Sequence, residues 1–516
     1  MKKRIVSALL ALVMTASLAA CGGGNSGGPI VNVDENGNYV VTDKDITLTY
    51  WHYEDPVTME KMAKAFTDIY PNIHVEVRQM EDMSKDLSAA AQAGNFPDVF
   101  GSTDADTTLA NMYWIDISDY YDKDPETQNL LPTINEYGLG CYDTNARFSV
   151  PNNYQPRAVY IDRNVIKKLN LEMPRTDWTW DEMIQLIKDA TREASAGDIK
   201  YYGLGWYTRL DSMYGLLASD PTQRPVKGEF GFDGKSFDLS HWAVGEQEFA
   251  DLILGGYIAP SQNTLEMEEW TGNFEAWFGE TGHVAVFTEG YWTFPNLWGS
   301  MITLENGEKI SYQDMYGLDI IPYVVPNVIE NKAANTLCDM QMAGVSSSCK
   351  YPYEAYLLLK FMTFGVDGWN ARLDLYEDDT IVNASGVPLF NSGSCVPLTL
   401  DEGVWNRYKP LMYKYEENKE YWDAFFASIT RPVTYGWQNI AGYWNFCDQY
   451  FNKIDIHAVV GSGRGKAADY VEEATRQANY YHSEAMISYF GPNGYDILSD
   501  EELAQYQAVV DDFTAQ

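Results

Sequence analysis

A pair of aromatic residues, Tyr291 and Trp292, follows shortly after the apolar stretch GHVAVF, which begins at Gly282. This stretch contains β-branched residues and begins at a glycine, which predicts a buried strand rather than an amphipathic helix. In open α/β sheets, ligands bind in the crevice outside the carboxyl ends of the strands. The pair is therefore a candidate binding surface, and the alternative is a set of core aromatics that closes a domain.

Two earlier strands are also predicted to end in aromatic and acidic residues. Residues 46–51 (ITLTYW) alternate as a strand does, and residues 98–100 (DVF), shortly after Gly94 and Pro97, predict a further strand. Because the carboxyl ends of parallel strands face the ligand side of a sheet, the residues at these ends are candidate ligand contacts. They are Trp51, Tyr53, Glu54 and Asp104.

The segments between these runs predict the helices that position them. Residues 56–69 and 82–93 keep apolar residues at helical spacing, and residues 73–77 (IHVEV) alternate as a further strand. Gly94 breaks the second of these helices. Strand, helix, strand, helix, strand at this pitch is the pattern of a parallel α/β sheet.

Two prolines bracket residues 152–155 in the sequence VPNNYQPRAVYID. This pattern predicts a crossover between two lobes, followed by a strand at residues 158–161. The crossover contributes Asn153 and Tyr154 to the candidate site. Trp206, in the aromatic run 201–207, and Gln341, in the apolar run 340–345, are candidates as well.

The rest of the chain predicts mostly helices. Helices are expected at residues 177–191, 239–254 and 266–279 and from residue 352 onward, with a largely helical tail after residue 400, and a strand is expected at residues 317–322. At 516 residues the chain exceeds what one hydrophobic core normally supports, so two lobes are the expectation.

The first residues have the composition of a secretory signal. Residues 2–4 (KKR) are cationic, residues 5–16 are apolar, and small residues follow. The segment ends in LAAC with Cys21, which resembles the lipobox of bacterial lipoproteins. That resemblance implies that residues 1–20 are removed and that Cys21 is diacylated, which anchors the protein to a membrane surface without spanning it. The alternative is ordinary signal cleavage beside an unmodified cysteine.

The residues after Cys21 predict a linker, and the net charge limits which partners the folded part can have. Residues 21–45 begin with GGGNSGG after the cysteine and predict a flexible tether. The formal net charge is −38, and loss of the cationic signal makes it more negative. This acidity argues against a nucleic-acid partner and against anionic membrane surfaces.

Motifs for catalysis, metals or cofactors are missing from the sequence. The five cysteines beyond Cys21 form no CxxC pair, so a zinc site or a dithiol redox motif is not expected. One or two disulfides, with Cys338 and Cys349 nearest in sequence, and a set of free buried cysteines are both open. The sequence has no HExxH, no complete P-loop and no GxSxG, and it predicts no cofactor.

Four stretches in a fixed order resemble the extracellular solute-binding proteins of family 1, the substrate-capturing lipoproteins of bacterial sugar ABC importers. They are ITLTYWHYED, FPDVFGSTDAD, the segment from VPNNYQPRAVYID to DWTWDEM, and NFEAWFGETGHVAVFTEGYWTF. They lie within residues 46–370, while residues 400–516 make the chain longer than most members.

The resemblance implies an α/β fold of two lobes, the type II periplasmic-binding-protein fold, joined by hinge crossovers that close on a ligand. The lobes would be residues 46–150 plus 283–340 and residues 151–282 plus 341–516. It also implies a carbohydrate ligand, ABC permease partners, a monomer and a place on the extracellular face of the cell membrane. The residue types fit a sugar, whose C–H faces stack on aromatic rings and whose hydroxyls need polar partners.

Two alternatives remain at this point. An extracellular glycoside hydrolase would share the acidic and aromatic composition, but it needs two carboxylates held across one bond, and ordinary acceptance of sugar hydroxyls explains the acids at the predicted strand ends. A binding protein of the same fold for a peptide or another solute is the second alternative.

Overall fold

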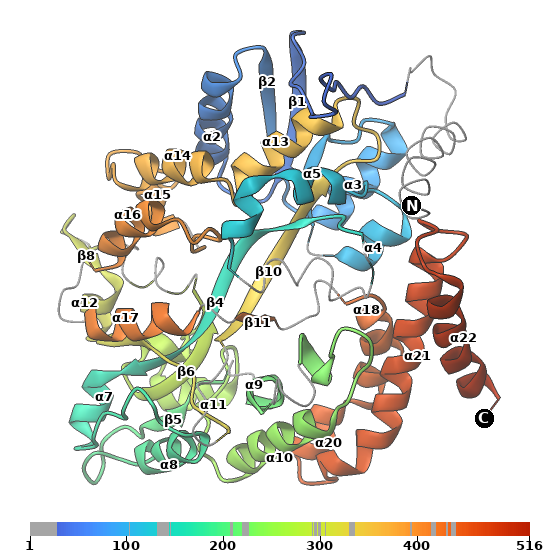
Figure 1. Cartoon of the computed structure of the whole chain (residues 1–516). Helices are drawn as coiled ribbons and strands as arrows, with labels where there is room; N and C mark the ends of the chain where they lie inside the picture. The colour runs from blue at the N-terminus through green and yellow to red at the C-terminus, as the bar shows by residue number, and fades with distance from the viewer. Residues whose placement is uncertain are drawn as a thin grey trace.

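Two groups of strands and helices are joined by two long strands in the middle of the molecule (Figure 1). The structure is a computed structural model. It describes residues 28–102, 104–131, 144, 146–206, 210–218, 226–291, 293, 297, 301–304, 306–329, 336–392, 395–413, 419–429, 432–434 and 440–515. The predicted signal and Cys21 therefore lie outside the described residues.

The first lobe contains the parallel β-α-β-α-β unit that the sequence predicts. Its elements are β1 (Ile46–His52), α2 (Pro56–Ile69), β2 (Ile73–Gln79), α3 (Met83–Ala93) and β3 (Val99–Ser102). β1 lies between the other two strands and is parallel to both. The Asp55 side chain caps the start of α2, and Gly94 ends α3 with a φ of 65°, a conformation that glycine adopts without steric cost.

Two long central strands run through both lobes. They are β4 (Val150–Asp162) and β10 (Thr336–Val345). β4 pairs antiparallel with β10 as far as Pro156, and from Arg157 onward it pairs with β6 (Val284–Gly290). The predicted crossover at residues 152–155 therefore lies inside a continuous strand. Because proline lacks an N–H donor, Pro156 fits the position where β4 changes its neighbour.

The second lobe has a hydrophobic core of its own, which includes Val159, Trp178, Val286 and Ile321. Its main elements are the second half of β4, α7 (Arg163–Lys168), α8 (Trp180–Ala190), β5 (Tyr202–Leu204), β6 and β9 (Ile320–Tyr323). α8 begins with a capping box between Thr179 and Glu182, which explains why the sequence DWTWDEM predicted a helix start.

The strands within residues 283–340, which are predicted to belong to the first lobe, pair with different parts of the central strands. β6 and β9 both pair with the second half of β4, and β6 also pairs with β5. Only β10 returns to the first lobe, where it pairs with β3. A strand of buried apolar residues predicts burial but not its neighbour, because pairing depends on distant segments. We therefore propose that the chain re-enters the first lobe along β10.

One predicted helix, residues 266–279, is shorter than expected. Helix α11 (Leu265–Thr271) ends at Gly272, whose φ of 75° is left-handed. The apolar spacing beyond that glycine continues by chance and does not carry a helix past it. The other elements of this region are α9 (Leu210–Leu217), α10 (Ser240–Leu254), β7 (Met301–Thr303), β8 (Lys309–Ser311) and α12 (Tyr312–Tyr316).

Helices that follow β10 cover the first lobe. They are α13 (Pro352–Thr363), α14 (Val366–Tyr376), α15 (Leu389–Ser392) and α16 (Glu402–Met412).

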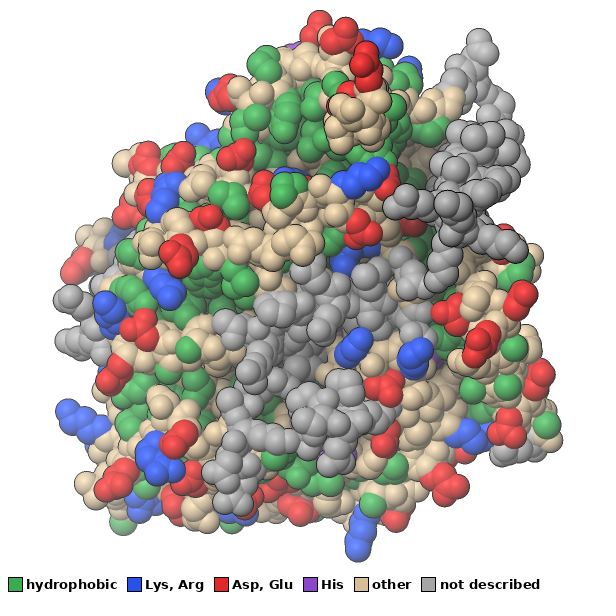
Figure 2. All heavy atoms as spheres, viewed as in Figure 1, with side chains coloured by type: hydrophobic (Ala, Val, Ile, Leu, Met, Phe, Trp, Pro, Cys, Tyr) green, Lys and Arg blue, Asp and Glu red, His purple; other side chains and the backbone are tan. Residues whose placement is uncertain are grey.

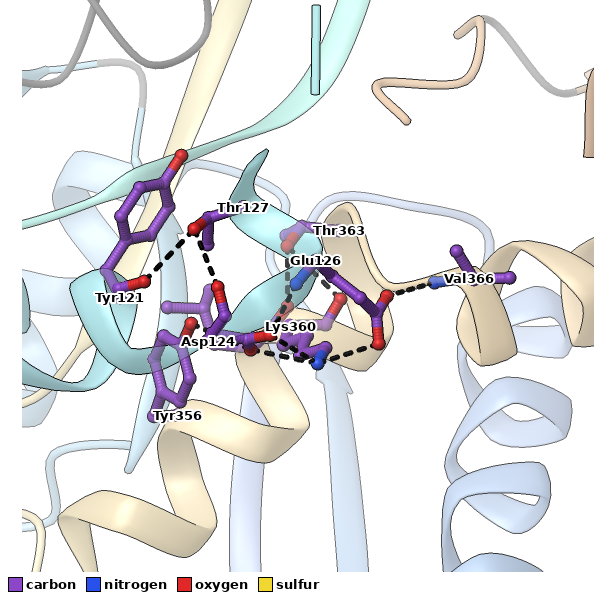
Figure 3. Close-up of polar contacts among 9 residues, drawn as sticks. Tyr121, Asp124, Glu126, Thr127, Tyr356, Lys360, Thr363 and Val366 are labelled. Carbon is purple, nitrogen blue, oxygen red and sulfur yellow. Dashed lines mark hydrogen bonds and ion pairs between the residues drawn. The ribbon is translucent and has the colours of Figure 1, made fainter. Parts of the chain in front are cut away.

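Lys360 of α13 forms ion pairs at the short helix η1 (Pro125–Asn129), which follows α5 (Ser118–Lys123). Its Nζ lies 2.8 Å from both Asp124 and Glu126 (Figure 3). Tyr356 donates to the same aspartate at 3.1 Å. This network fixes η1 against α13.

The C-terminal part of the chain is mostly helical, as predicted. Its elements are α17 (Lys419–Ser428), β11 (Pro432–Thr434), α18 (Tyr443–Phe446), η6 (Cys447–Phe451), α19 (Asn452–Ile454), α20 (Ile456–Gly461), η7 (Ala467–Tyr470), α21 (Val471–Phe490) and α22 (Asp500–Thr514). α21 and α22 lie side by side along one edge of the molecule, beside both lobes (Figure 1).

The described surface carries acidic and basic side chains interspersed over the face shown in Figure 2. Within the described part of the chain, no helix is long and apolar enough to cross a membrane. The same residues contain no group of three or more His, Cys, Asp or Glu that could hold a metal ion. Four cysteines are described, and they form no disulfide with one another: Cys338, Cys349, Cys395 and Cys447.

Candidate ligand-binding site

Strands from both lobes end toward the same stretch of the central strands. In the first lobe β3 ends at Ser102, opposite Met342 of β10. In the second lobe β6 runs antiparallel to β4 and ends at Gly290, opposite Arg157. The stretch of β4 and β10 between these two levels therefore lies between the carboxyl ends of strands from both lobes. Ligands of open α/β sheets bind beyond such ends.

One face of this stretch is polar. Side chains alternate between the two faces of a strand, and directly opposed residues share a face. Gln155 of β4 lies opposite Asp339 of β10, and both are buried, with exposures of 7% and 5%. Arg157 and Gln341 follow two residues away on the same strands. We call these four residues the central polar face.

Arg157 holds two carboxylates near the central polar face. Its Nε donates to Oδ2 of Asp339 at 2.8 Å, and its Nη1 lies 3.5 Å from Oε1 of Glu289. Burial raises the pKa of Glu289, and Arg157 offsets this only in part. The other oxygen of Asp339, Oδ1, is buried without a hydrogen-bond partner. Such an oxygen costs free energy until a donor reaches it, so Asp339 offers an acceptor to a ligand hydroxyl.

Glu54, predicted as a ligand contact, has a partner in the first lobe. It forms an ion pair with Arg372 of α14, with 3.3 Å between Nη2 and Oε2. Burial pushes the pKa of Glu54 upward, but the attraction of Arg372 outweighs burial and the pKa is lowered. The neighbouring His52 is neutral near pH 7, because burial lowers its pKa to about 4. Glu54 thus anchors the end of β1 to α14.

The other first-lobe candidates also take part in local structure. Trp51 is only 6% exposed, and the guanidinium carbon of Arg78 lies 4.2 Å from its ring centroid. Tyr53 is half-buried at the end of β1. Asp104 caps α4 (Ala105–Ala110), where its Oδ1 accepts from a backbone N–H at 2.9 Å. A ligand contact by any of these three residues remains a prediction.

Two predicted contacts, Tyr154 and Tyr291, are packed as core residues, with exposures of 0% and 1%. Tyr154 donates its hydroxyl to the carbonyl of Ile429 at 2.9 Å. Tyr291 shares a hydrogen bond with the hydroxyl of Tyr408 and lies 2.7 Å from the sulfur of Met412. Burial leaves these two side chains no surface for a ligand, because the helices after residue 400 cover them. We leave both out of the site proposed below.

Of the four remaining predicted contacts, the structure describes the side chains of two, Trp206 and Gln341. Trp206 follows β5 and is 39% exposed, so its ring is accessible beside the carboxyl end of that strand. Gln341 is half-buried on the central polar face. Asn153 lies opposite Gln341 in the register, but its side chain is not described. Trp292 lies outside the described residues.

Three residues of the central polar face were not among the predicted contacts: Gln155, Arg157 and Asp339. They could have been found from Asn153 and Gln341, because residues two or four positions apart share a strand face. Asp106 lies in the first turn of α4 and accepts from the backbone N–H of Gly442 at 2.7 Å. Burial raises its pKa to about 7. No sequence signal pairs Asp106 with a residue so far along the chain.

A family model described as bacterial extracellular solute-binding protein matches residues 51–364, which is more than half of the chain. The chain belongs to this family. The family resemblance inferred from the four sequence stretches is thereby confirmed. Members of this family bind solutes without transforming them, so the glycoside-hydrolase alternative is excluded.

Solved structures share the two-lobed fold of this solute-binding protein at low sequence identity. An ABC substrate-binding protein from Listeria monocytogenes in complex with cycloalternan has 17% identity and a TM-score of 0.58, covering 84% of this chain and 98% of its own. A sugar transporter protein from Rhizobium etli in an open conformation has 16% identity and a TM-score of 0.60, with coverages of 84% and 99%.

A third structure is the sugar-binding protein MalE from Xanthomonas citri, at 13% identity and a TM-score of 0.57, covering 85% of this chain and 98% of its own. These likenesses confirm the predicted type II fold of two α/β lobes. A comparison with curated proteins finds no match.

Proposed function

We propose that this protein captures a neutral carbohydrate between its two lobes, on the central polar face, and closes on it by a hinge motion of β4 and β10. One observation carries the proposal: Oδ1 of Asp339 is buried without a partner while Arg157 occupies the other oxygen. A sugar hydroxyl is a neutral donor that can satisfy this oxygen without bringing a second charge. Gln155 and Gln341 add amide donors and acceptors beside it.

A carbohydrate is favoured over a peptide by two further facts. The accessible ring of Trp206 suits the apolar C–H face of a sugar. Several structural neighbours are described with sugar ligands, among them cycloalternan and α-D-tagatose. The net charge of −38 disfavours anionic solutes as well.

Anchoring and delivery complete the proposal. Diacylated Cys21 would hold the protein on the extracellular face of the cell membrane, and the residues directly after it would act as a tether. The predicted tether of residues 21–45 is too long, because the N–H groups of Ile30 and Thr42 donate to the Lys350 carbonyl at 2.8 Å and to Glu354 at 2.7 Å. The loaded protein, as a monomer, would pass its ligand to the permease subunits of an ABC importer. These steps are supported by the lipobox resemblance and by the family.

A thermal-shift panel on the full chain, purified in a mild detergent, tests the ligand class. The panel contains α-D-tagatose, maltotriose, cycloalternan and tetra-alanine. A ligand that binds only the folded state stabilises it by about 2.7 kcal/mol at a concentration of about 100 times Kd. We expect at least one carbohydrate to raise Tm and the peptide to have no effect. Stabilisation by the peptide alone would overturn the carbohydrate proposal.

A further inference from the structure

Helix α18 stands where the two lobes and the C-terminal part of the chain meet, beyond the residues matched by the family model. The chain reaches it from β11, which pairs with β10 at Thr336–Cys338, directly before Asp339. In Figure 1, α18 lies between the upper and lower groups of elements, at the level of β10 and β11. Its printed bond to the first lobe is the one to Asp106, in the helix that follows the carboxyl end of β3.

Three consecutive residues at α18 take three different roles. The N–H of Gly442 donates to Asp106 of the first lobe at 2.7 Å. The hydroxyl of Tyr443 donates to Glu229 of the second lobe at 2.6 Å. Trp444 follows and is 38% exposed, with its ring 5.6 Å from the Tyr443 ring in an edge-on arrangement. The two residues before Trp444 are thus hydrogen-bonded to Asp106 and Glu229, while the Trp444 ring keeps an accessible surface.

The attachment to the second lobe is buried and aromatic. Glu229 is completely buried and also accepts from the hydroxyl of Ser212. The ring of Phe230 stacks on Tyr443 with 5.7 Å between centroids. A buried carboxylate with two hydroxyl donors and an aromatic neighbour is costly to disrupt, so these contacts hold Tyr443 firmly in place.

The attachment to the first lobe places α18 at the predicted ligand side of β3. Asp106 lies four residues after Ser102, which ends β3 opposite Met342 of β10. β11 meets β10 at Cys338. β11 therefore meets β10 directly before Asp339, and α18 is bonded to the helix that follows the carboxyl end of β3.

Helix α21 reinforces this arrangement, because its middle and its C-terminal end contact different parts of the molecule. Asn479 exchanges hydrogen bonds of 2.8 and 3.1 Å with the backbone of Phe237 in the second lobe. At the other end, Phe490 stacks on Phe148 of the first lobe with centroids 5.8 Å apart. A continuous helix between these contacts gives α18 a firm backing.

We propose that Trp444 is a ligand-contact residue, which offers its ring to the C–H face of the carbohydrate at the junction of the lobes. The inference rests on the proposed function and adds to it. It makes the C-terminal part of the chain a third component of the binding site, beside the two lobes. A large exposed aromatic side chain on a rigid support is a low-entropy platform for a sugar ring.

The test compares Trp444→Ala and Trp444→Phe with the wild-type full chain by calorimetric titration of maltotriose and cycloalternan. The control is Phe274→Ala, because Phe274 is 41% exposed and lies in the second lobe. We expect Trp444→Ala to raise Kd about tenfold, which is about 1.4 kcal/mol, Trp444→Phe to recover most of the affinity, and Phe274→Ala to change nothing. The Tm without ligand should stay unchanged in all three.

Two outcomes separate this inference from the proposed function. If the wild type binds a carbohydrate and Trp444→Ala binds it equally well, the role of Trp444 is wrong and the proposed function stands. If the wild type binds neither these sugars nor any other carbohydrate in the panel, the proposed function fails first. Hydrogen exchange gives a measurement that needs no variant: ligand should slow exchange in residues 440–451, and unchanged exchange there during binding would also overturn the inference.

Discussion

Two clusters of one cation and two carboxylates differ in how completely they are satisfied. In the first lobe, Lys360 binds Asp124 and Glu126, and each carboxylate oxygen has a partner (Figure 3). Between the lobes, Arg157 binds Asp339 and approaches Glu289, and one oxygen of Asp339 has no partner. We call the first cluster closed, because all of its carboxylate oxygens have partners, and the second open, because one oxygen has none.

The difference separates a structural network from a binding site. A buried ion pair repays its desolvation only when the remaining lone pairs are hydrogen-bonded, as they are around Lys360. The open cluster leaves a buried acceptor unsatisfied, and its natural complement is a donor from outside the chain. The closed cluster should therefore govern stability, and the open one should govern affinity.

The largest expected effect comes from breaking the closed cluster. Lys360→Met removes the cation and leaves two carboxylates facing each other, with the side chain of Asp124 only 6% exposed. We expect the free energy of unfolding to fall by about 3 kcal/mol. Urea denaturation of the ligand-free chain measures this loss, and a change below about 0.5 kcal/mol would show that this network contributes no more than a surface pair. The Kd of the surviving folded protein for its sugar should stay the same.

A substitution in the open cluster should weaken ligand binding and leave the ligand-free stability nearly unchanged. Asp339→Asn keeps the shape of the side chain but removes the charge that faces Arg157 and replaces one acceptor oxygen with a donor group. We expect Kd for the bound sugar to rise at least tenfold, about 1.4 kcal/mol or more, while Tm without ligand stays nearly constant. Calorimetric titration beside thermal unfolding separates the two quantities. A large loss of ligand-free stability with normal affinity would reverse the comparison.

The exposed ring of Trp206 should affect the affinity for the ligand and not the ligand-free stability. Trp206→Ala removes a side chain that is 39% exposed, so little packing is lost. We expect Kd to rise several-fold, about 1 kcal/mol, with unchanged ligand-free Tm. Titration with the sugar that stabilises the wild type gives the answer, and unaltered affinity would remove Trp206 from the site.

The smallest effect concerns the pH dependence of the open cluster. Burial raises the pKa of Glu289, so the folded state binds a proton more tightly than the unfolded chain does. Stability should then fall as pH rises from the ordinary glutamate pKa through the raised one. Glu289→Gln should flatten this part of the profile of unfolding free energy against pH. An identical slope in wild type and variant would show that Glu289 does not cause this pH dependence.

The closed cluster should show no such slope near neutral pH. Burial lowers the pKa of Lys360, but its bonds to Asp124 and Glu126 outweigh burial and raise it. The stability that this shift contributes is fully present below the ordinary lysine pKa and is lost as pH rises through the raised one. A Lys360→Met profile should therefore run parallel to wild type between pH 5 and 8, roughly, and converge on it only at high pH.

Much of the fold could be predicted because its signals are local. Alternation marked β1, and Gly94 marked the end of α3. Candidate residues were harder to judge, since their partners lie far along the chain. Glu54 pairs with Arg372 across 318 positions, and Tyr154 donates to Ile429 across 275. Nothing near either residue in the sequence announces that its polar group is already engaged.

The sequence by itself determined the order of strands and helices, the crossover between two prolines and the family. The tertiary structure alone decided that β6 pairs with the second half of β4, that Tyr291 is covered by α16, and that Asp339 keeps an unsatisfied oxygen. The reason is physical. Periodicity fixes which side chains share a face, but the segment that covers a face, and so the choice between core and binding surface, comes from contacts between distant parts of the chain.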